Sequence, residues 1–156
     1  MRKLLFALML VLATSAVAQE GLDDFIELLR ADFKTQKVAI ITEVMEFTEE
    51  ESAVFWPLYR EYELERDGLM DARLQLIKDY AAAWEMMTDE SADKIYQRAV
   101  KIREKETKLN NKYYKKIKKE TSAITAVKFM QVMNQIDLLV RLQINAELPL
   151  VEKADS

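Results

Sequence analysis

The sequence contains no histidine and no cysteine. These two residues are the usual protein ligands of zinc, copper and haem iron, and histidine is also the commonest general base. Without them the serines of the chain have no imidazole to activate them as nucleophiles. We therefore expect no enzyme, and neither a cofactor nor a metal site.

Glycine and proline are also scarce, with two of each in 156 residues. The chain is instead rich in Ala, Leu, Glu, Lys and Met, which favour helices. So few turn-forming residues suit a small number of long helices joined by short connections. The sequence predicts an all-α fold of about four helices, and without disulfides this fold must be held by packing alone.

The first 18 residues have the three parts of a signal peptide. The basic start MRK is followed by the apolar run LLFALMLVLA and by the cleavage signal AVA, which ends at Ala18. The apolar run is about half the roughly 20 residues that cross a bilayer, so we expect cleavage and no stable membrane insertion. This predicts a periplasmic or secreted protein with a signal peptide over 1–18, one helical domain over 19–150 and a flexible tail over 151–156.

Four helices are predicted from apolar periodicity and capping signals. The first runs from Leu22 to near Met45, and the second starts at Thr48 in the segment FTEEESAVFWPLYREY. Thr48 and Glu51 have the spacing of a capping box. A third helix follows an N-cap at Thr88, and a last one begins after the break at residues 120–125 and ends at Pro149.

The second and third helices are expected to form a long hairpin of coiled-coil type. Pro57 lies inside the second helix and predicts a kink, because it lacks an amide N–H. We interpret Trp56, Pro57 and Tyr59 as the residues that shape the base of the hairpin, with a ligand-binding aromatic site as the alternative for Trp56. The apolar stripe of the third helix consists of Ile95, Ala99, Ile102, Leu109, Tyr113 and Ile117.

Two further packing predictions concern the hairpin and the last helix. Glu106 interrupts the stripe of the third helix and either meets Arg66 or Arg73 across the hairpin or is solvated. The last helix has an unusually wide apolar face, which should be buried against the hairpin base and against either the first helix or a second subunit. This face consists of Phe129, Val132, Met133, Ile136, Leu139, Val140 and Ile144.

Charge is strongly segregated along the chain. Residues 20–93 contain 20 acidic and 7 basic residues, whereas residues 94–119 contain 11 basic and 2 acidic ones. The basic helix is either a solvated face that balances the acidic helix or a surface that attracts other proteins. Nucleic acid is not expected as a partner of an exported chain. The candidate contact residues are Lys112, Tyr113, Tyr114, Lys115, Lys116 and Lys119.

The arrangement resembles the Spy/CpxP family of periplasmic proteins, which have L-T-x-x-Q motifs near two helix starts. The counterparts here are Phe47-Thr48-Glu49-Glu50-Glu51 and Ile124-Thr125-Ala126-Val127-Lys128, in which only the two threonines match strictly. The basic third helix is similar in layout to the corresponding helix of that family. The resemblance implies a cradle-shaped helical dimer that acts as an ATP-independent chaperone or restrains an envelope-stress sensor.

We therefore expect an exported helical protein that binds unfolded or envelope proteins, through electrostatic attraction followed by apolar contact. The alternative is a structural or regulatory adaptor that docks one specific partner, such as a sensor domain. Peripheral attachment to a membrane through the apolar face of the last helix is a third hypothesis.

Overall fold

The computed structural model describes residues 36–150. The predicted signal peptide, the predicted helical positions from Leu22 to Phe33 and the tail 151–156 lie outside the described residues. The chain divides into two units, Met1–Glu43 and Val44–Ser156. Residues 36–45 are helical, so the predicted end of the first helix near Met45 is confirmed.

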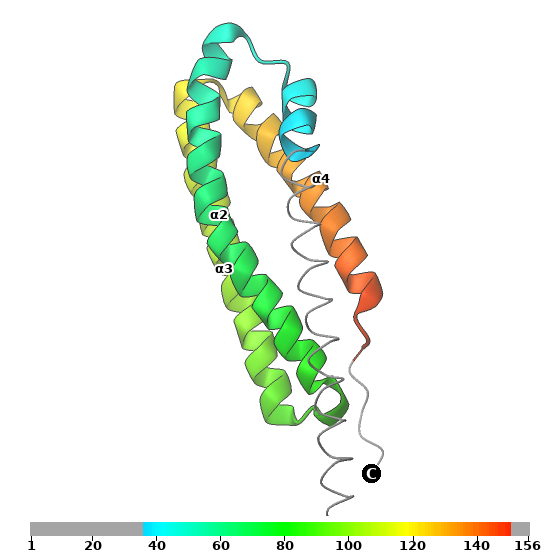
Figure 1. The fold of residues 1–156 in the computed structure, drawn as a ribbon. Helices are drawn as coiled ribbons and strands as arrows, with labels where there is room; N and C mark the ends of the chain where they lie inside the picture. The colour runs from blue at the N-terminus through cyan, green and yellow to red at the C-terminus, as the bar shows by residue number, and fades with distance from the viewer. Residues whose placement is uncertain (1–35, 151–156) are drawn as a thin grey trace, which may run out of the picture. The chain divides into compact units, whose positions relative to one another are not determined.

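The second unit contains the remaining helices. They are α2 (Glu49–Ala83), the short 3₁₀ helix η1 (Trp84–Met86), α3 (Asp89–Glu120) and α4 (Ala123–Glu147). Helices α2 and α3 pack side by side as a hairpin, and α4 packs against α3 (Figure 1). The prediction of an all-α fold with a long helical hairpin is therefore confirmed.

The helix starts form where the sequence places capping residues. The Thr48 hydroxyl accepts a hydrogen bond from the amide of Glu51, and the Glu51 carboxylate accepts one from the amide of Thr48, both at 3.2 Å. Thr88 makes the same reciprocal arrangement with Ser91 at the start of α3. These bonds satisfy amides that have no partner inside the helix, which fixes where each helix begins.

Helix α2 continues through Pro57 to Ala83, and Figure 1 shows that it is curved rather than straight. Proline lacks the amide N–H that would bond the carbonyl four residues earlier, at Ala53, and this favours curvature. Pro57 is itself exposed. The interpretation of this residue as an architectural element of the helix agrees with its position.

The apolar core lies at the end of the hairpin where α2 begins and α3 ends. The buried residues of α2 are confined to Phe55, Tyr59 and Tyr62, in its first half. Their rings pack around Phe129 of α4, which is fully buried. The buried residues of α3 and α4 that complete this core are Ile102, Leu109, Tyr113, Ile117, Ala126, Val132, Met133 and Ile136.

Candidate functional site

The two predicted motifs meet at the base of the hairpin. One carboxylate oxygen of Glu51 accepts a hydrogen bond from the Thr48 amide. The other accepts a hydrogen bond from the Thr125 hydroxyl at 2.9 Å. The Thr125 amide in turn donates to the hydroxyl of Ser122, the N-cap of α4. One carboxylate therefore links the start of α2 to the start of α4.

The last position of the second motif also makes a specific contact. The Lys128 ammonium lies 3.5 Å from the carbonyl of Met45 and 3.4 Å from the Glu46 carboxylate. Glu46 has a φ of 52°, the left-handed conformation that commonly follows the end of a helix. Lys128 thus supports the turn that enters α2. Ile124, by contrast, is 81% exposed and lies outside the core.

Trp56 and Tyr59, two of the residues predicted to shape the base, lie in an aromatic cluster there. Tyr59 is buried, and Trp56 is half-buried with its ring edge-on to Phe47, Phe55 and Tyr59. An open depression adjoins this cluster, and its lining includes Trp56, Pro57 and Arg60. Trp56 therefore contributes both to the packing of the base and to the surface.

Some lysines of the basic segment of α3 form ion pairs with acidic residues of α2. Lys112 and Lys116 form ion pairs with Glu65 and Glu61 of α2, at 2.6 and 2.7 Å. Hydrogen bonds from Lys112 and from the Tyr113 hydroxyl hold the pKa of the Glu65 carboxyl below its ordinary value. These ion pairs neutralise α2 and α3 against each other, as one of the two interpretations of the basic helix requires.

Tyr113 corrects one expectation. Its side chain is 0% exposed, its ring packs against Tyr62 at 5.3 Å, and burial raises the pKa of its phenol. It belongs to the packed interior because it is in phase with the apolar stripe of α3. Tyr114 is half-buried, and Lys115 and Lys119 are exposed.

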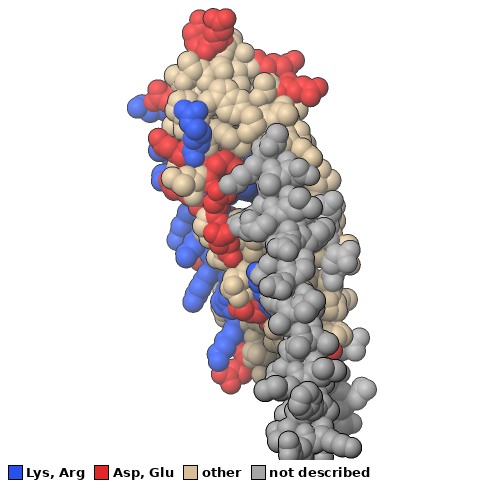
Figure 2. All heavy atoms as spheres, viewed as in Figure 1, with Lys and Arg blue, Asp and Glu red and all other residues tan. Residues whose placement is uncertain are grey.

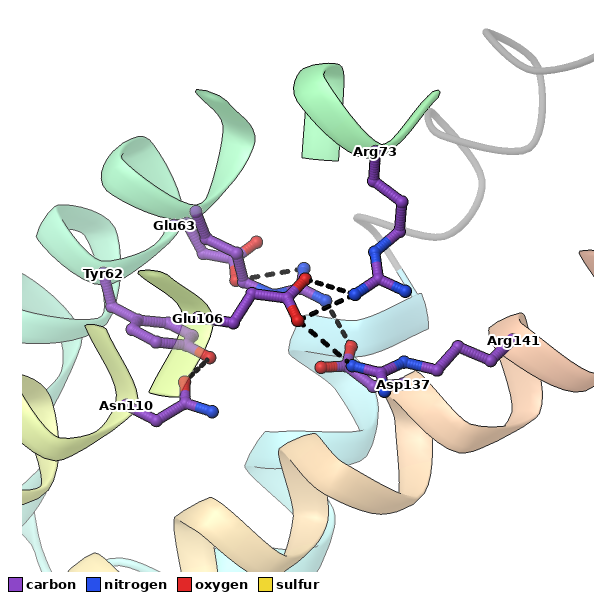
Figure 3. Close-up of polar contacts among 8 residues, drawn as sticks. Tyr62, Glu63, Arg73, Glu106, Asn110, Asp137 and Arg141 are labelled. Carbon is purple, nitrogen blue, oxygen red and sulfur yellow. Dashed lines mark hydrogen bonds and ion pairs between the residues drawn. The ribbon is translucent and has the colours of Figure 1, made fainter. Parts of the chain in front are cut away.

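A polar network crosses the middle of the three helices (Figure 3). Arg73 donates to both oxygens of Glu106 at 2.7 Å, so the predicted contact across the hairpin is confirmed. The guanidinium of Arg141, from α4, lies 3.3 Å from the same carboxylate. Glu106 thus connects all three helices, because one carboxylate receives an arginine from α2 and another from α4.

Arg66 forms an ion pair with Asp137 of α4, a contact that no sequence pattern predicts. Burial alone would lower the pKa of the Arg66 guanidinium, but the charge of Asp137 and other nearby groups raise it above its ordinary value. Arg66 therefore keeps its charge beside the core. The network borders a groove of about 290 Å³ whose lining combines these charged groups with Met70, Leu76, Ile77, Ile102, Val140 and Ile144.

Helix α4 exposes a second apolar face, opposite the one that it buries. Leu138, Leu139 and Leu142 are 54%, 64% and 58% exposed. Ile124 and Val127 lie on the same side by helical spacing and are 81% and 43% exposed. Leu139 does not face the hairpin, and its burial against the first helix or a second subunit stays a prediction. Leu138, Leu139 and Leu142 form a cluster of exposed apolar side chains, and such clusters mark sites of contact with other molecules.

Residues 36–150 contain no group of three or more acidic side chains placed to hold a metal ion. Within the same range, every helix is too short or too polar to cross a membrane. Comparisons with protein-family models, curated proteins and solved structures gave no match. The resemblance to the Spy/CpxP family stays a prediction.

Proposed function

We propose that this protein is an exported helical protein that binds unfolded or envelope proteins, as an ATP-independent chaperone or as a modulator of a stress sensor. The observation that carries the proposal is the exposed apolar face of α4, with Leu138, Leu139 and Leu142 at its centre. Such a face offers contact to apolar segments that folded proteins hide and unfolded ones expose.

Charge supplies the second half of the proposed mechanism. The exposed lysines of α3 attract partners of opposite charge over a longer distance than apolar contact allows. Neither attraction nor apolar contact requires a fixed sequence in the partner. The pair of effects therefore suits transient binding of many different unfolded chains.

Aggregation of a chemically unfolded protein tests this proposal. Residues 19–156, the chain expected after signal cleavage, are mixed with reduced α-lactalbumin, and light scattering is followed at low and high salt. We expect suppression at near-stoichiometric amounts, weakened by salt. The triple variant Leu138→Ser, Leu139→Ser, Leu142→Ser should suppress aggregation about tenfold less well, because it removes apolar contact area.

The matched control is the triple variant Leu64→Ser, Met86→Ser, Tyr96→Ser, which removes exposed apolar side chains elsewhere. It should behave as the unchanged protein does. If the two triple variants lose activity equally, the α4 face is not the binding surface. If the unchanged protein gives no suppression at any ratio, the chaperone form of the proposal is wrong.

The second candidate is an adaptor that docks one envelope partner. It is favoured by the open depression beside Trp56 and Pro57, since aromatic side chains at the surface often anchor one specific partner. It predicts tight binding of a single protein without general protection of unfolded ones.

A further inference from the structure

One side of α3 carries a straight row of lysines, which we call the lysine ridge. Side chains three and four residues apart lie on the same side of a helix, and this row follows that spacing from end to end. At 1.5 Å per residue it is about 27 Å long. Figure 2 shows Lys and Arg side chains gathered in a column along the edge where α3 lies. The ridge consists of Lys101, Lys105, Lys108, Lys112, Lys115 and Lys119, all of them exposed.

The ridge is neutralised near its middle but not over its first half. Lys112, near the middle, pairs with Glu65, and Arg98, one turn before the ridge, pairs with Asp79. Between these two ion pairs, within the range 36–150, no carboxylate lies within 4.0 Å of the ammonium groups of Lys101, Lys105 and Lys108.

The register of the hairpin explains the uneven neutralisation. Glu65 and Asp79 lie on one stripe of α2, opposite Lys112 and Arg98. The positions of the same stripe between them carry no charge. A Cβ added at Gly68 would have nothing within 4 Å, so this part of the hairpin edge is also open. The uncharged positions are Gly68, Ala72 and Gln75.

The composition of the ridge distinguishes among partners. Protein interfaces are depleted in lysine and centred on aromatic or arginine anchors, and the ridge positions include neither. Small ligands need a recess, whereas the ridge residues line neither of the two hollows described above. Lysine is a flexible point charge that suits a diffuse negative surface more than a fixed acidic group.

We propose that the lysine ridge lays α3 lengthwise on an anionic phospholipid surface, with Lys101, Lys105 and Lys108 as the main contacts. Each lysine that reaches such a surface raises binding about fivefold. The net negative charge of the chain opposes this only weakly, because salt screens charges farther away than about 8 Å. With no apolar side chain on the ridge, the protein adsorbs without inserting. This inference shares the exposed lysines of α3 with the proposed function, but it does not require the apolar face of α4.

Vesicle flotation tests it with residues 19–156. Vesicles of equimolar phosphatidylcholine and phosphatidylglycerol should carry the protein upward at about 0.15 M salt, and vesicles of phosphatidylcholine alone should not. The triple variant Lys101→Gln, Lys105→Gln, Lys108→Gln should bind about 100-fold more weakly, at about fivefold per lysine. A control variant, Arg60→Gln, Arg103→Gln, Lys118→Gln, has the same change in net charge at exposed positions off the ridge. It should keep most of the binding.

Circular dichroism confirms that each variant is folded before its binding is compared. Equal losses in the two triple variants would mean that overall charge, not the ridge, governs binding, and would overturn the proposal. Binding to pure phosphatidylcholine that disappears in the α4 leucine variant would assign attachment to the apolar face instead. Binding to soluble polyglutamate without binding to anionic vesicles would assign the ridge to an acidic protein partner, which also overturns it.

Discussion

Glu51 shows how much structure one side chain can fix. Its two carboxylate oxygens accept hydrogen bonds from different helix starts, one from the Thr48 amide and one from the Thr125 hydroxyl. The Thr125 hydroxyl donates its one proton to Glu51. The Ser122 hydroxyl, 2.8 Å from the Thr125 hydroxyl, must therefore be the donor in the contact between them. Protons along this chain of groups therefore all point toward the carboxylate.

We expect Glu51→Ala to lower the free energy of unfolding by about 1 to 2 kcal/mol, because it removes half of a capping box and a link between helices. Glu51→Gln should cost less, since an amide can accept from Thr48 and donate to Thr125. Chemical denaturation measures both changes. A double-mutant cycle with Thr125→Val should give a coupling of about 0.5 to 1.5 kcal/mol. Zero coupling would show that the link does not stabilise the fold.

At the scale of elements, the two halves of α2 are stabilised by different forces. The first half buries aromatic residues, and the described second half has no buried residue. That half has only half-buried apolar residues, such as Leu76 and Ile77, and adds the ion pairs of Arg73 with Glu106 and of Asp79 with Arg98. Tyr80, and Trp84 just after the helix, donate hydrogen bonds to the carbonyls of Pro149 and Leu150. Partly exposed ion pairs contribute little, so the end of the hairpin away from the base should open first.

Gly68 marks the boundary between these halves. It lies inside α2, and a Cβ at this position would meet no other atom within 4 Å. Gly68→Ala should therefore raise the free energy of unfolding by about 0.5 to 1 kcal/mol, the cost of glycine in a helix interior. Thermal denaturation measures the change, with Ala72→Gly as the reverse control. A destabilising Gly68→Ala would mean that the helix needs the freedom of glycine here.

The sequence predicted the elements better than the contacts between them. Capping residues and the periodic spacing of apolar residues are local signals, and they predicted the starts of α2 and α3 correctly. The contact of Arg66 with Asp137 depends on how α4 crosses the hairpin, which no local pattern encodes. The sequence placed Tyr113 both in the apolar stripe with Leu109 and Ile117 and, because of the charges around it, among the candidate contact residues. Phase along the helix was the better guide.

At the scale of the whole molecule, the segregation of charge along the sequence becomes an arrangement of opposite charges in space. Folding the chain back at η1 places the acidic α2 beside the basic α3, and ion pairs such as Glu65 with Lys112 join them. Figure 2 shows acidic side chains where α2 begins and basic ones along α3. The charges of the hairpin therefore cancel wherever an acidic residue of α2 lies opposite a basic residue of α3.

This arrangement makes the hairpin sensitive to acid. Hydrogen bonds from Lys112 lower the pKa of Glu65 from its ordinary value of 4.5, and those from Arg98 lower the pKa of Asp79 from 3.8. A carboxyl whose pKa is lower in the folded state stabilises the fold above its unfolded pKa. That contribution is lost as the pH falls through the folded value.

We therefore expect Glu65→Gln to lower the urea midpoint of unfolding at neutral pH and to have progressively less effect below pH 4.5. The difference between the two proteins isolates this group from the other carboxyls that titrate in the same range. Glu85→Gln, at an exposed position outside the ion pairs between α2 and α3, is the matched control and should show no such dependence. A difference for Glu65→Gln that stays constant with pH would contradict the argument, because the cost would then come from lost packing rather than from lost charge.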